Sequence, residues 1–490
     1  MHNSQGLEKV LSLRQEILAG DEKRLKEQRD AGKLTARERI AKIADAGSFV
    51  ELFALVSRND EGAGVVTGYA TIEERPVYLF AQDFTVRGGA MGQLQAAKIV
   101  KLLELAQKTG APVLALMDSA GVRIDEGAQA LSAYSEIYQK MARMSGVCPM
   151  VALVLGPCIG GAALLSQLAD VSIVAEKVGQ LMVFGPQVMA AMHGAQVDAE
   201  KFGGAKVAAE TGACALTAAS EDEALLKARQ VLALLPSSNL EDTEIVDTDD
   251  LNRLLPALDP ADADALLNAV ADQGTLVELY AAYESSIKVA LARLGGSSVG
   301  LVAANGKLTA GALQKAARFV RFMDCYGIPV VSLLNTCGVE VNGVKEQSWL
   351  FKAQSQLLYA YAEATVPKVA VVTGDAVGQA YVAMGGKAMA DVTYAWPSAV
   401  ISALTPEAAV AVLYQDEVKA DKELSVEEAR AKYASEYVEN VAGCLNAAKQ
   451  GMVDDVIEPA KTRAMLISAL EMLMSKRDSN PPKKHGNLPM

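Results

Sequence analysis

Two glycine-containing turns are the segments of this chain best suited to chemistry. The first reads Gly-Pro-Cys-Ile-Gly-Gly-Ala-Ala at 156–163, and the second reads Thr-Gly-Asp-Ala-Val-Gly-Gln-Ala-Tyr at 373–381. Each follows an apolar run that predicts a buried strand and precedes a predicted helix, so unpaired backbone N–H groups and the positive end of a helix dipole meet there. Such amides can hold an oxyanion, and glycine lets a substrate carbonyl approach them closely. The same glycines would also permit tight packing of a helix on a strand, and the local motif does not separate the two interpretations.

Other catalytic machinery is scarce in the sequence. Of three histidines only His193 lies away from the termini, and we expect it to be an ordinary helix-surface residue. The one G-x-S-x-G match, at 296–300, precedes an apolar run instead of joining a strand to a helix. There is no P-loop or dinucleotide-binding fingerprint, and the six cysteines show no C-x-x-C spacing, so no metal site is predicted. Histidine catalysis, ATP hydrolysis and hydride transfer therefore lose support.

The elements that must position the two turns form an internal repeat. Residues 108–131 align with 325–348, which places Asp118 on Asn335, and residues 146–165 align with 364–383. Each copy predicts a helix, a strand, a glycine turn, a second helix, another strand and a second glycine turn. The predicted strands are 113–117, 151–155, 330–334 and 369–372, and the predicted helices before them are 94–108 and 312–325. This alternation predicts an α/β fold built largely from parallel pairing and duplicated along the chain.

Length, charge and composition set the broad class of protein. A chain of 490 residues favours two large domains, which we place at 1–245 and 246–476, followed by a flexible polar tail at 477–490. The segment 235–267, rich in Pro, Ser and acidic residues, predicts a solvated connector. The net charge of −13 (46 basic minus 59 acidic residues) argues against nucleic-acid binding. The amino terminus lacks the pattern of an export signal, so a cytoplasmic chain is expected.

A further set of motifs occurs in a fixed order along the chain. In the first half these are GKLTARERI (32–40), GVVTGY (64–69), QDFTVRGG (82–89), DSAGVRI (118–124) and GPCIGG (156–161); in the second half they are LLYAYAEATVPK (357–368) and YAWP (394–397). Together they resemble the carboxyltransferase component of biotin-dependent acyl-CoA carboxylases and decarboxylases, over roughly residues 5–475. The resemblance implies two tandem crotonase-like domains of the ClpP/crotonase superfamily. The first domain would bind acyl-CoA and the second would bind biotin.

The resemblance also implies residue roles. The first oxyanion hole would use the amides of Gly160 and Gly161, and the second those of Gln379 and Ala380. The remaining implied contacts are Arg87, Gly88, Gly89, Ala120 and Gly121 for acyl-CoA, and Cys337, Gly338, Val339, Gly378 and Val382 for biotin. In the family, carboxybiotin releases CO2, the biotin enolate removes the α-proton of the thioester, and the thioester enolate captures CO2. No acid or base of the protein is required for this chemistry.

The second half departs from the family pattern at three places. Gln379 stands where related sequences usually have glycine, and it keeps an amide donor only if its backbone stays in a common region. The familiar Pro-Gly-Phe-x-Pro-Gly loop is replaced by the segment 337–343, and the run after Trp396-Pro397 lacks a Met-Gly-rich turn. The biotin side is thus the more divergent half.

The resemblance further implies partners. No Met-Lys-Met is present, so biotin would arrive on a separate carrier protein. The complex would add a biotin carboxylase subunit or a membrane decarboxylase subunit, the latter holding this chain at the inner membrane through a partner. In the family, catalysis requires a homo-oligomer, a dimer or a trimer of dimers.

Three hypotheses of function remain open at this point. The first is an active carboxyltransferase, either a propionyl-CoA carboxylase β-type subunit or the α subunit of a sodium-pumping methylmalonyl- or glutaconyl-CoA decarboxylase. The second is a non-catalytic scaffold. The third is a single-site crotonase-like enzyme, a hydratase or isomerase, which would need a carboxylate beside the first oxyanion hole, with Glu126 and Asp125 as candidates. The aliphatic residue Val382 slightly favours a decarboxylase, because propionyl-specific members often have an acidic residue at this position.

Overall fold

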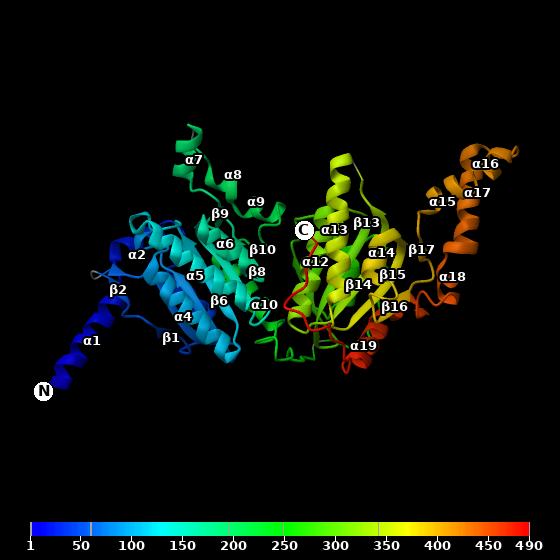
Figure 1. Ribbon diagram of the computed structural model, residues 1–490. Helices are drawn as coiled ribbons and strands as arrows, with labels where there is room; N and C mark the ends of the chain where they lie inside the picture. Colours follow the sequence, from blue (N-terminus) through cyan, green and yellow to red (C-terminus); the bar gives the residue numbers. More distant parts are fainter. Residues whose placement is uncertain (1, 59–60, 195, 248, 342, 490) are drawn as a thin grey trace. The chain divides into compact units, whose positions relative to one another are not determined.

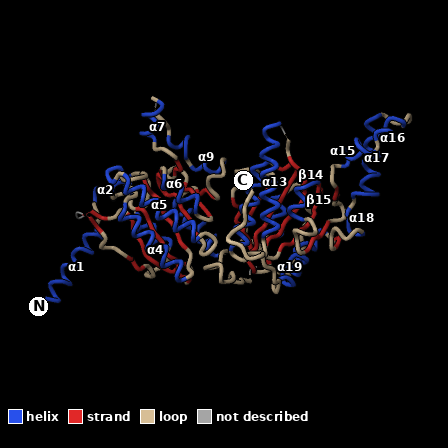
Figure 2. The backbone as a smooth tube through the Cα atoms, viewed as in Figure 1, coloured by secondary structure: helices blue, strands red, loops and turns tan. Residues whose placement is uncertain are grey.

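The chain divides into two compact units in the computed structural model, which describes residues 2–58, 61–194, 196–247, 249–341 and 343–489. The first unit is Met1–Asp242 and the second is Thr243–Met490. This division lies close to the boundary expected at residue 245. Figure 1 follows the chain through both units, and Figure 2 shows that each contains a sheet accompanied by helices.

The described part of the first unit contains an eight-stranded sheet. Its order is β1-β4-β5-β6-β7-β8-β10, with β9 pairing with β7 beside β8. The pairs β1–β4 and β4–β5 are antiparallel, and all the others are parallel. The strands are β1 (Val50–Leu52), β4 (Val65–Ile72), β5 (Arg75–Gln82), β6 (Val113–Ser119), β7 (Met150–Ile159), β8 (Val171–Ala175), β9 (Gln180–Met182) and β10 (Leu216–Ala218), and a separate hairpin joins β2 (Ser57–Arg58) to β3 (Glu61–Gly62).

Helices flank this sheet. The helices are α1 (His2–Ala19), α2 (Glu22–Asp30), α3 (Ala36–Ile43), α4 (Gln93–Thr109), α5 (Ala128–Met144), α6 (Gly161–Leu168), α7 (Pro186–His193), α8 (Ala199–Gly203), α9 (Ala205–Glu210) and α10 (Glu221–Ala233). α4 buries Ile99, Leu102 and Leu103 in one core cluster with alternate residues of β6 and β7. α4 then ends at Gly110, whose φ of 65° suits the left-handed cap of a helix.

The second unit repeats the same sheet. Its order is β11-β12-β13-β14-β15-β16-β18, with β17 pairing with β15, so each strand has a counterpart in the first unit. The strands are β11 (Val277–Leu279), β12 (Ile287–Leu294), β13 (Ser297–Leu308), β14 (Val330–Val339), β15 (Lys368–Val377), β16 (Val392–Ala395), β17 (Val400–Ser402) and β18 (Asp455–Val456). The helices are α11 (Ala263–Val270), α12 (Ala310–Cys325), α13 (Val344–Glu363), α14 (Gly378–Gly385), α15 (Pro406–Leu413), α16 (Gln415–Ala420), α17 (Val426–Tyr437), α18 (Cys444–Lys449) and α19 (Thr462–Leu473). The predicted duplicated α/β fold with mostly parallel pairing is confirmed.

Two predicted strands are longer than the sequence indicated. β7 continues through Gly156 to Ile159, and β15 continues through Gly374 to Val377, so the expected glycine turns begin as strand. The extra residues pair with β9 and β17, which take over as partners where β8 and β16 end. Only the last residues of each motif form the turn into a helix.

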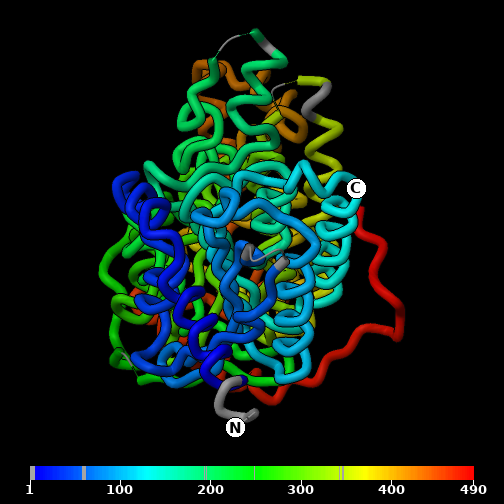
Figure 3. Tube along the Cα trace, turned by 90° about the vertical axis from the view of Figure 1, so that its left-hand side faces the viewer, coloured from blue at the N-terminus to red at the C-terminus, as the bar shows by residue number. Residues whose placement is uncertain are grey.

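The connector and the tail also differ from expectation. α11 begins inside the predicted connector and continues three residues past its end. It buries Leu266, Leu267 and Val270 in the core of the second unit, because Asp262 caps the helix and its apolar residues recur at helical spacing. The C-terminal segment, which appears at the outside of the second unit in Figure 3, makes specific contacts with α13. Asn480 donates to the Glu363 carbonyl at 2.7 Å, and Lys483 pairs with the Glu363 carboxylate at 2.5 Å. Its polarity therefore does not prevent it from lying along a helix.

Candidate active site

The first glycine turn joins the end of β7 to the start of α6. Gly160 has φ of 60°, a left-handed conformation that favours glycine. Gly161 has no such φ, but a Cβ there would lie 2.6 Å from the Tyr134 ring and 2.7 Å from the Tyr138 hydroxyl. Glycine is therefore required at 160 by the left-handed backbone conformation, and at 161 because Tyr134 and Tyr138 leave no room for a side chain.

The amides of the turn differ in their availability. The Gly160 N–H donates to the Met182 carbonyl at 2.8 Å, which continues the pairing of β7 with β9. This amide is therefore engaged, although the sequence motif had indicated it as an oxyanion donor. Within the described parts of the chain, the Gly161 amide has no hydrogen-bond acceptor. It lies at the N-terminus of α6, where a helix leaves such groups unpaired.

A second open amide belongs to Val122, just beyond the end of β6. Gly121, with φ of 113°, accepts hydrogen bonds at its carbonyl from the Met91 amide (2.8 Å) and the Tyr134 hydroxyl (3.1 Å). The C=O and N–H of a trans peptide point in opposite directions, so fixing the Gly121 carbonyl also fixes the Val122 N–H. A Cβ on Gly121 would lie 3.4 Å from the Ile159 carbonyl, which places this turn beside the first one.

Val122 and Gly161 line the same cavity. Its volume is about 610 Å³, and its lining residues are Val122, Leu131, Tyr134, Ser135, Tyr138, Gln139, Ala142 and Gly161. None of these residues is acidic or basic. The sequence analysis did not single out Val122; the signal that could have done so is its place directly after a glycine that follows β6. Two residues with unpaired backbone amides among the described residues therefore line one mainly apolar cavity.

The loop predicted to contact acyl-CoA lies beside the first unit's turns. Arg87, Gly88 and Gly89 form one 3-10 turn (η1), and all three have positive φ. The Ala120 amide donates to the Gly88 carbonyl at 2.9 Å, so the structure brings this loop onto the Ala120–Gly121 segment. A side chain at Gly89 would overlap the Asp118 carbonyl, which explains why glycine stands there.

A second, basic cavity opens from this loop. It has a volume of about 400 Å³ and is lined by Arg24, Glu27, Gln28, Ala31, Lys33, Phe84, Thr85, Arg87 and Gly88. Arg24 donates to the Thr85 carbonyl at 2.9 Å, and the Lys33 ammonium lies 3.9 Å from the centre of the Phe84 ring. Each of its three cations is also paired with a carboxylate outside the lining: Arg24 with Asp21 at 3.7 Å, Lys33 with Asp118 at 3.0 Å and Arg87 with Asp125 at 2.5 Å.

A buried ion network supports the end of β6. Asp118 pairs with Arg39 at 2.9 Å and with Lys33 at 3.0 Å, and Arg39 also pairs with Glu221 at 2.7 Å. Burial raises the pKa of Asp118, against the opposing charges of Arg39 and Lys33. A side chain at Gly156 would overlap the Asp118 carboxylate, so the network packs directly against β7.

The carboxylates required by a hydratase or isomerase are engaged elsewhere. Glu126 accepts a hydrogen bond from the Gln93 amide at 2.8 Å and lies 3.6 Å from Arg123, so it caps α4. Asp125 pairs with Arg87 at 2.5 Å. Neither lines the cavity of Val122 and Gly161, which weighs against the single-site hypothesis. The side chain of His193 lies outside the described residues.

The second unit reproduces the backbone of the first at its own turn. Gly338 and Gly378 have φ of 108° and 69°, close to the values at Gly121 and Gly160. Thr336 donates to the Gly338 carbonyl at 3.2 Å, as Ser119 does to Gly121 at 3.3 Å. Gln379 has no positive φ and its side chain is exposed, so its amide needs no glycine-only conformation.

The other residues predicted for biotin lie around this turn. Cys337, Gly338 and Val339 belong to the end of β14 and are not a loop, because β13 is long enough to pair with Gly338 and Val339, while Cys337 lies at a shift in the register. Residue 342 of the same segment lies outside the described residues. Ala380 is buried in α14, whereas Val382, two residues further on, is 39% exposed. Here Asn335 occupies the place of Asp118 and donates to Asn305 at 2.9 Å.

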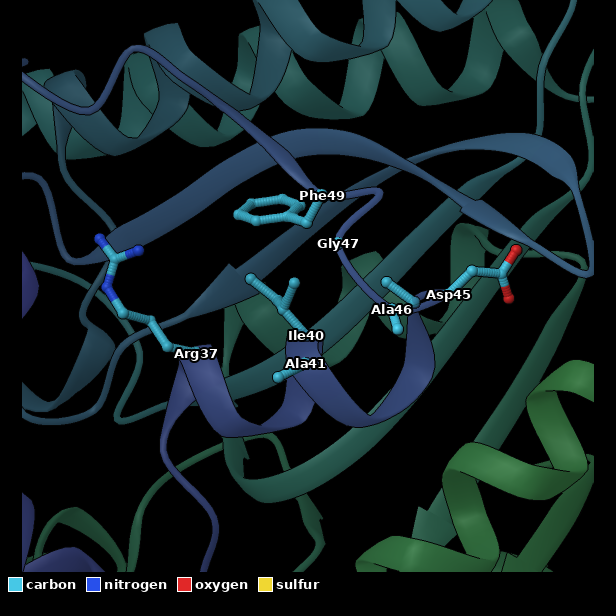
Figure 4. A pocket seen from close by; sticks show the side chains of 8 residues that line it. Arg37, Ile40, Ala41, Asp45, Ala46, Gly47 and Phe49 are labelled. Carbon is cyan, nitrogen blue, oxygen red and sulfur yellow. The ribbon is translucent and has the colours of Figure 1, made fainter.

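A smaller pocket of about 200 Å³ lies apart from these turns, near α3. Figure 4 shows Phe49 and Ile40 facing each other there, with Arg37 and Asp45 toward its two ends. Arg37 pairs with Glu51 at 2.8 Å, and Asp45 accepts hydrogen bonds from the amides of Glu73 and Glu74. Both charged residues are therefore used in holding the fold.

Nearly the whole sequence of the chain, including both turns, matches a known protein family. The family model described as "Carboxyl transferase domain" matches residues 27–488. The chain belongs to this family. It is a carboxyltransferase of the biotin-dependent acyl-CoA carboxylases and decarboxylases, with two crotonase-like domains.

Relatives extend over nearly the whole carboxyltransferase chain. It is 39% identical to "Methylmalonyl-CoA decarboxylase subunit alpha" of Veillonella parvula, covering 96% of each chain. It is 37% identical to "Propionyl-CoA carboxylase beta chain" of Saccharopolyspora erythraea, covering 97% of this chain and 94% of that one. A solved structure of transcarboxylase 12S, described as a hexamer with methylmalonyl-coenzyme A and methylmalonic acid bound, matches with a TM-score of 0.92 and 38% identity, over 99% of this chain and 98% of that one.

Proposed function

We propose that this chain moves a carboxyl group between biotin on a separate carrier protein and the α-carbon of a small acyl-CoA. The observation that carries the proposal is the duplicated pair of glycine turns. In the first unit, Val122 and Gly161, whose amides have no acceptor among the described residues, line one cavity without acids or bases. The first unit is assigned to acyl-CoA and the second to biotin. The substrates named for the relatives above support a three- or four-carbon acyl group.

In the first unit, the amides of Val122 and Gly161 would hold the thioester oxygen. They would stabilise it most when the α-carbon loses a proton and the oxygen becomes an enolate, because fixed N–H donors favour developing negative charge. No acid or base lines the cavity, so the chain would orient the α-carbon and leave the proton to the other reactant. This replaces the expected pair Gly160–Gly161 by Val122–Gly161.

The basic cavity suits the phosphates of CoA. Arg24, Lys33 and Arg87 surround it, and Gly88, which also lines it, bonds to Ala120 just before the first hole. A CoA thioester must place its charged end and its thioester on one continuous surface. The contact between the loop at 87–89 and the segment 120–122 provides that continuity.

The backbone around Gly378 in the second unit is suited to bind the ureido group of biotin. Gly338 and Gly378 reproduce the conformation of the first hole, and the exposed side chain of Gln379 leaves its amide in place. When bound, biotin supplies the ring that carries and gives up the carboxyl group. The chain would hold the ureido oxygen with the amides of Gln379 and Ala380. Cys337, Val339 and Val382 would line the approach.

Partners follow from the same assignment. We propose a homo-oligomer, a dimer or a trimer of dimers. It is supported by exposed apolar residues in helices α7 and α8 and just before α7, namely Val183, Phe184, Val188, Met192 and Phe202. A biotin carrier protein would work with either a biotin carboxylase subunit or a membrane decarboxylase subunit. No helix among the described residues is long and apolar enough to span a bilayer. We propose a cytoplasmic enzyme, with any attachment to the membrane made through a partner.

The proposal is tested by incubating the chain with free biotin and methylmalonyl-, malonyl- or glutaconyl-CoA. We expect CO2 release above the rate without protein. The matched control is a Gly161→Gln chain, in which the new side chain meets Tyr134. A rate equal to that without protein for all three substrates would favour a non-catalytic scaffold.

The direction of transfer is a finer proposal. Aliphatic Val382, partly exposed on α14, favours the decarboxylase assignment over a propionyl-CoA carboxylase. Reconstitution decides between them: a decarboxylase should couple to a sodium-pumping membrane subunit. A carboxylase should instead consume ATP with a biotin carboxylase subunit.

A further inference from the structure

Two tyrosines on α5 connect the turns that carry the open amides. Tyr134 and Tyr138 lie one helical turn apart, and their rings stack with centroids 5.6 Å apart at an angle of 18°. The Tyr134 hydroxyl donates to the Gly121 carbonyl at 3.1 Å, and the Tyr138 hydroxyl donates to the Gly161 carbonyl at 2.9 Å. One helix face therefore holds both halves of the first hole, although these halves come from different strands.

Each phenol acts on a different turn. Tyr134 holds the Gly121 carbonyl, and since this peptide is planar, it also sets the direction of the Val122 N–H. Tyr138 holds the first residue of α6, which carries the other amide. The distance between the two donors then depends on two stacked rings that cannot move independently.

Both phenols remain neutral donors. Burial raises the pKa of Tyr134 and of Tyr138 above the ordinary value of 10.0. Their hydrogen bonds to the carbonyls therefore persist over the pH range in which a CoA thioester is stable. The effect of removing a hydroxyl should accordingly not depend on pH.

The second unit shows that the fold itself does not demand these tyrosines. The residues of α13 that align with Tyr134 and Tyr138 are Phe351 and Ser355, and the Ser355 hydroxyl donates to the Phe351 carbonyl within the helix. The tyrosines of α13 also bond elsewhere, Tyr361 with Ser332 at 2.8 Å and Tyr359 with Glu363 at 3.1 Å. The residue after Gly378 is the exposed Gln379. The tyrosine pair is a feature of the acyl-CoA side alone.

We propose that Tyr134 and Tyr138 are positioning residues that set the spacing of the two amides at Val122 and Gly161. The proposal rests on the proposed function, because the spacing matters only if these amides hold a thioester oxygen. The hydroxyls act through the carbonyls of Gly121 and Gly161 and take no part in proton transfer. Their effect should appear in kcat, since an oxyanion hole acts mainly on the transition state.

The test compares Tyr138→Phe and Tyr134→Phe with the unaltered chain in the carboxyl-transfer assay. Phenylalanine keeps the ring and the stacking but removes the hydroxyl. Misplacing an oxyanion donor without deleting it should lower kcat by about tenfold, with KM for the acyl-CoA changed by less than about twofold. The loss should be the same at every pH between 6.5 and 8.5. Tyr359→Phe in the second unit is the matched control and should leave kcat unchanged.

The outcomes separate this inference from the proposed function. Unaltered kcat in both phenylalanine variants, or a rise in KM with kcat unchanged, would overturn the positioning role while the transfer activity stands. A loss of kcat that tracks a fall in the thermal unfolding midpoint would assign the tyrosines to stability alone and also overturn it. Absence of transfer by the unaltered chain would overturn the proposed function, and the positioning role with it.

Discussion

The two units share one sheet topology but differ in what surrounds their glycine turns. In the first unit the residue after the positive-φ glycine is Gly161, pressed against Tyr134 and Tyr138; in the second it is Gln379, whose side chain is exposed. Gly160 and Gly378 keep the same backbone conformation in both. The first glycine of the motif is therefore required by its left-handed backbone conformation, and the second is required only where neighbouring side chains leave no room for a Cβ. A Gly-to-Gln difference therefore does not by itself signal a lost site.

The polar residue beneath each turn differs as well. Asp118 is fully buried and paired with two cations, whereas Asn335 is bonded to Asn305 and to the amide of Asp375. Both pack against a strand glycine, Gly156 or Gly374, where a side chain would overlap them. The common requirement is a polar anchor between two parallel strands. The charge of the anchor is a property of the first unit alone.

The largest expected effect comes from breaking the charged anchor. Arg39→Met leaves Asp118 and Glu221 buried without their shared cation, and loss of one partner of a buried pair typically costs about 3–5 kcal/mol of stability. Asn305→Ala in the second unit removes two neutral hydrogen bonds, one from Asn335 and one to the Ala261 carbonyl, and should cost about 1–2 kcal/mol. Denaturant unfolding of the two variants measures the difference. Equal losses would show that the charge contributes nothing beyond hydrogen bonding.

The next prediction exchanges the residues after the two glycines. Gly161→Gln forces a side chain against Tyr134 and should lower turnover at least about a hundredfold, comparable to loss of an oxyanion donor. Gln379→Gly keeps the amide and only relaxes the backbone, so turnover should stay within about tenfold. Steady-state rates at saturating acyl-CoA with varied biotin, on variants shown to be folded by circular dichroism, make the comparison. A larger loss of turnover in Gln379→Gly than in Gly161→Gln would contradict the conclusion that the first unit, and not the second, has no room for a side chain after the positive-φ glycine.

A smaller effect concerns a feature that the units share. Lys98 and Lys315 occupy equivalent positions on α4 and α12, and their ammonium groups donate to backbone carbonyls, Val65 at 2.7 Å and Glu284 at 2.9 Å respectively. Burial lowers the pKa of each to about 8 from 10.5. Because the folded-state pKa lies below the unfolded one, the unfolded chain binds more protons between pH 8 and 10.5, and stability should rise with pH across that window.

Methionine at either lysine removes this titration. The stability of Lys98→Met relative to the parent should fall by about 1–3 kcal/mol as pH rises from 8 to 10.5, and Lys315→Met should behave alike. Unfolding midpoints measured at several pH values check the slope. A relative stability that is flat with pH would mean that the lysines ionise as freely in the folded chain as in the unfolded one.

The sequence predicted the repeating strands and helices well, because their apolar runs are short, charge-free and bounded by proline or glycine. β6, β7, β14 and β15 begin within one residue of the expected positions. The sequence could not show that β7 and β15 continue into their glycine motifs, since the partners β9 and β17 are short strands from later in the chain. Pairing with a distant segment overrode a local turn signal.

The candidate site was predictable only in part. The motifs indicated Gly160, Gly161 and the loop at 87–89. The assignment of Gly161 and the loop stays a prediction, whereas the Gly160 N–H is engaged by the Met182 carbonyl, an acceptor that nothing in the local sequence indicates. The motifs did not indicate Val122, which we propose as a donor because Gly121 is held by Tyr134, thirteen positions further along. A donor's direction is set by what holds the opposite end of its peptide, and that information is tertiary.

The most direct test of the account is a crystal structure of the chain with a non-hydrolysable acyl-CoA analogue. We expect the carbonyl oxygen of the analogue within about 3 Å of the amide nitrogens of both Val122 and Gly161, where oxyanion donors must lie. The phosphates should lie near Arg24, Lys33 and Arg87. A carbonyl oxygen away from both amides, or an analogue bound at Gly378 and Gln379, would contradict the assignment of acyl-CoA to the first unit.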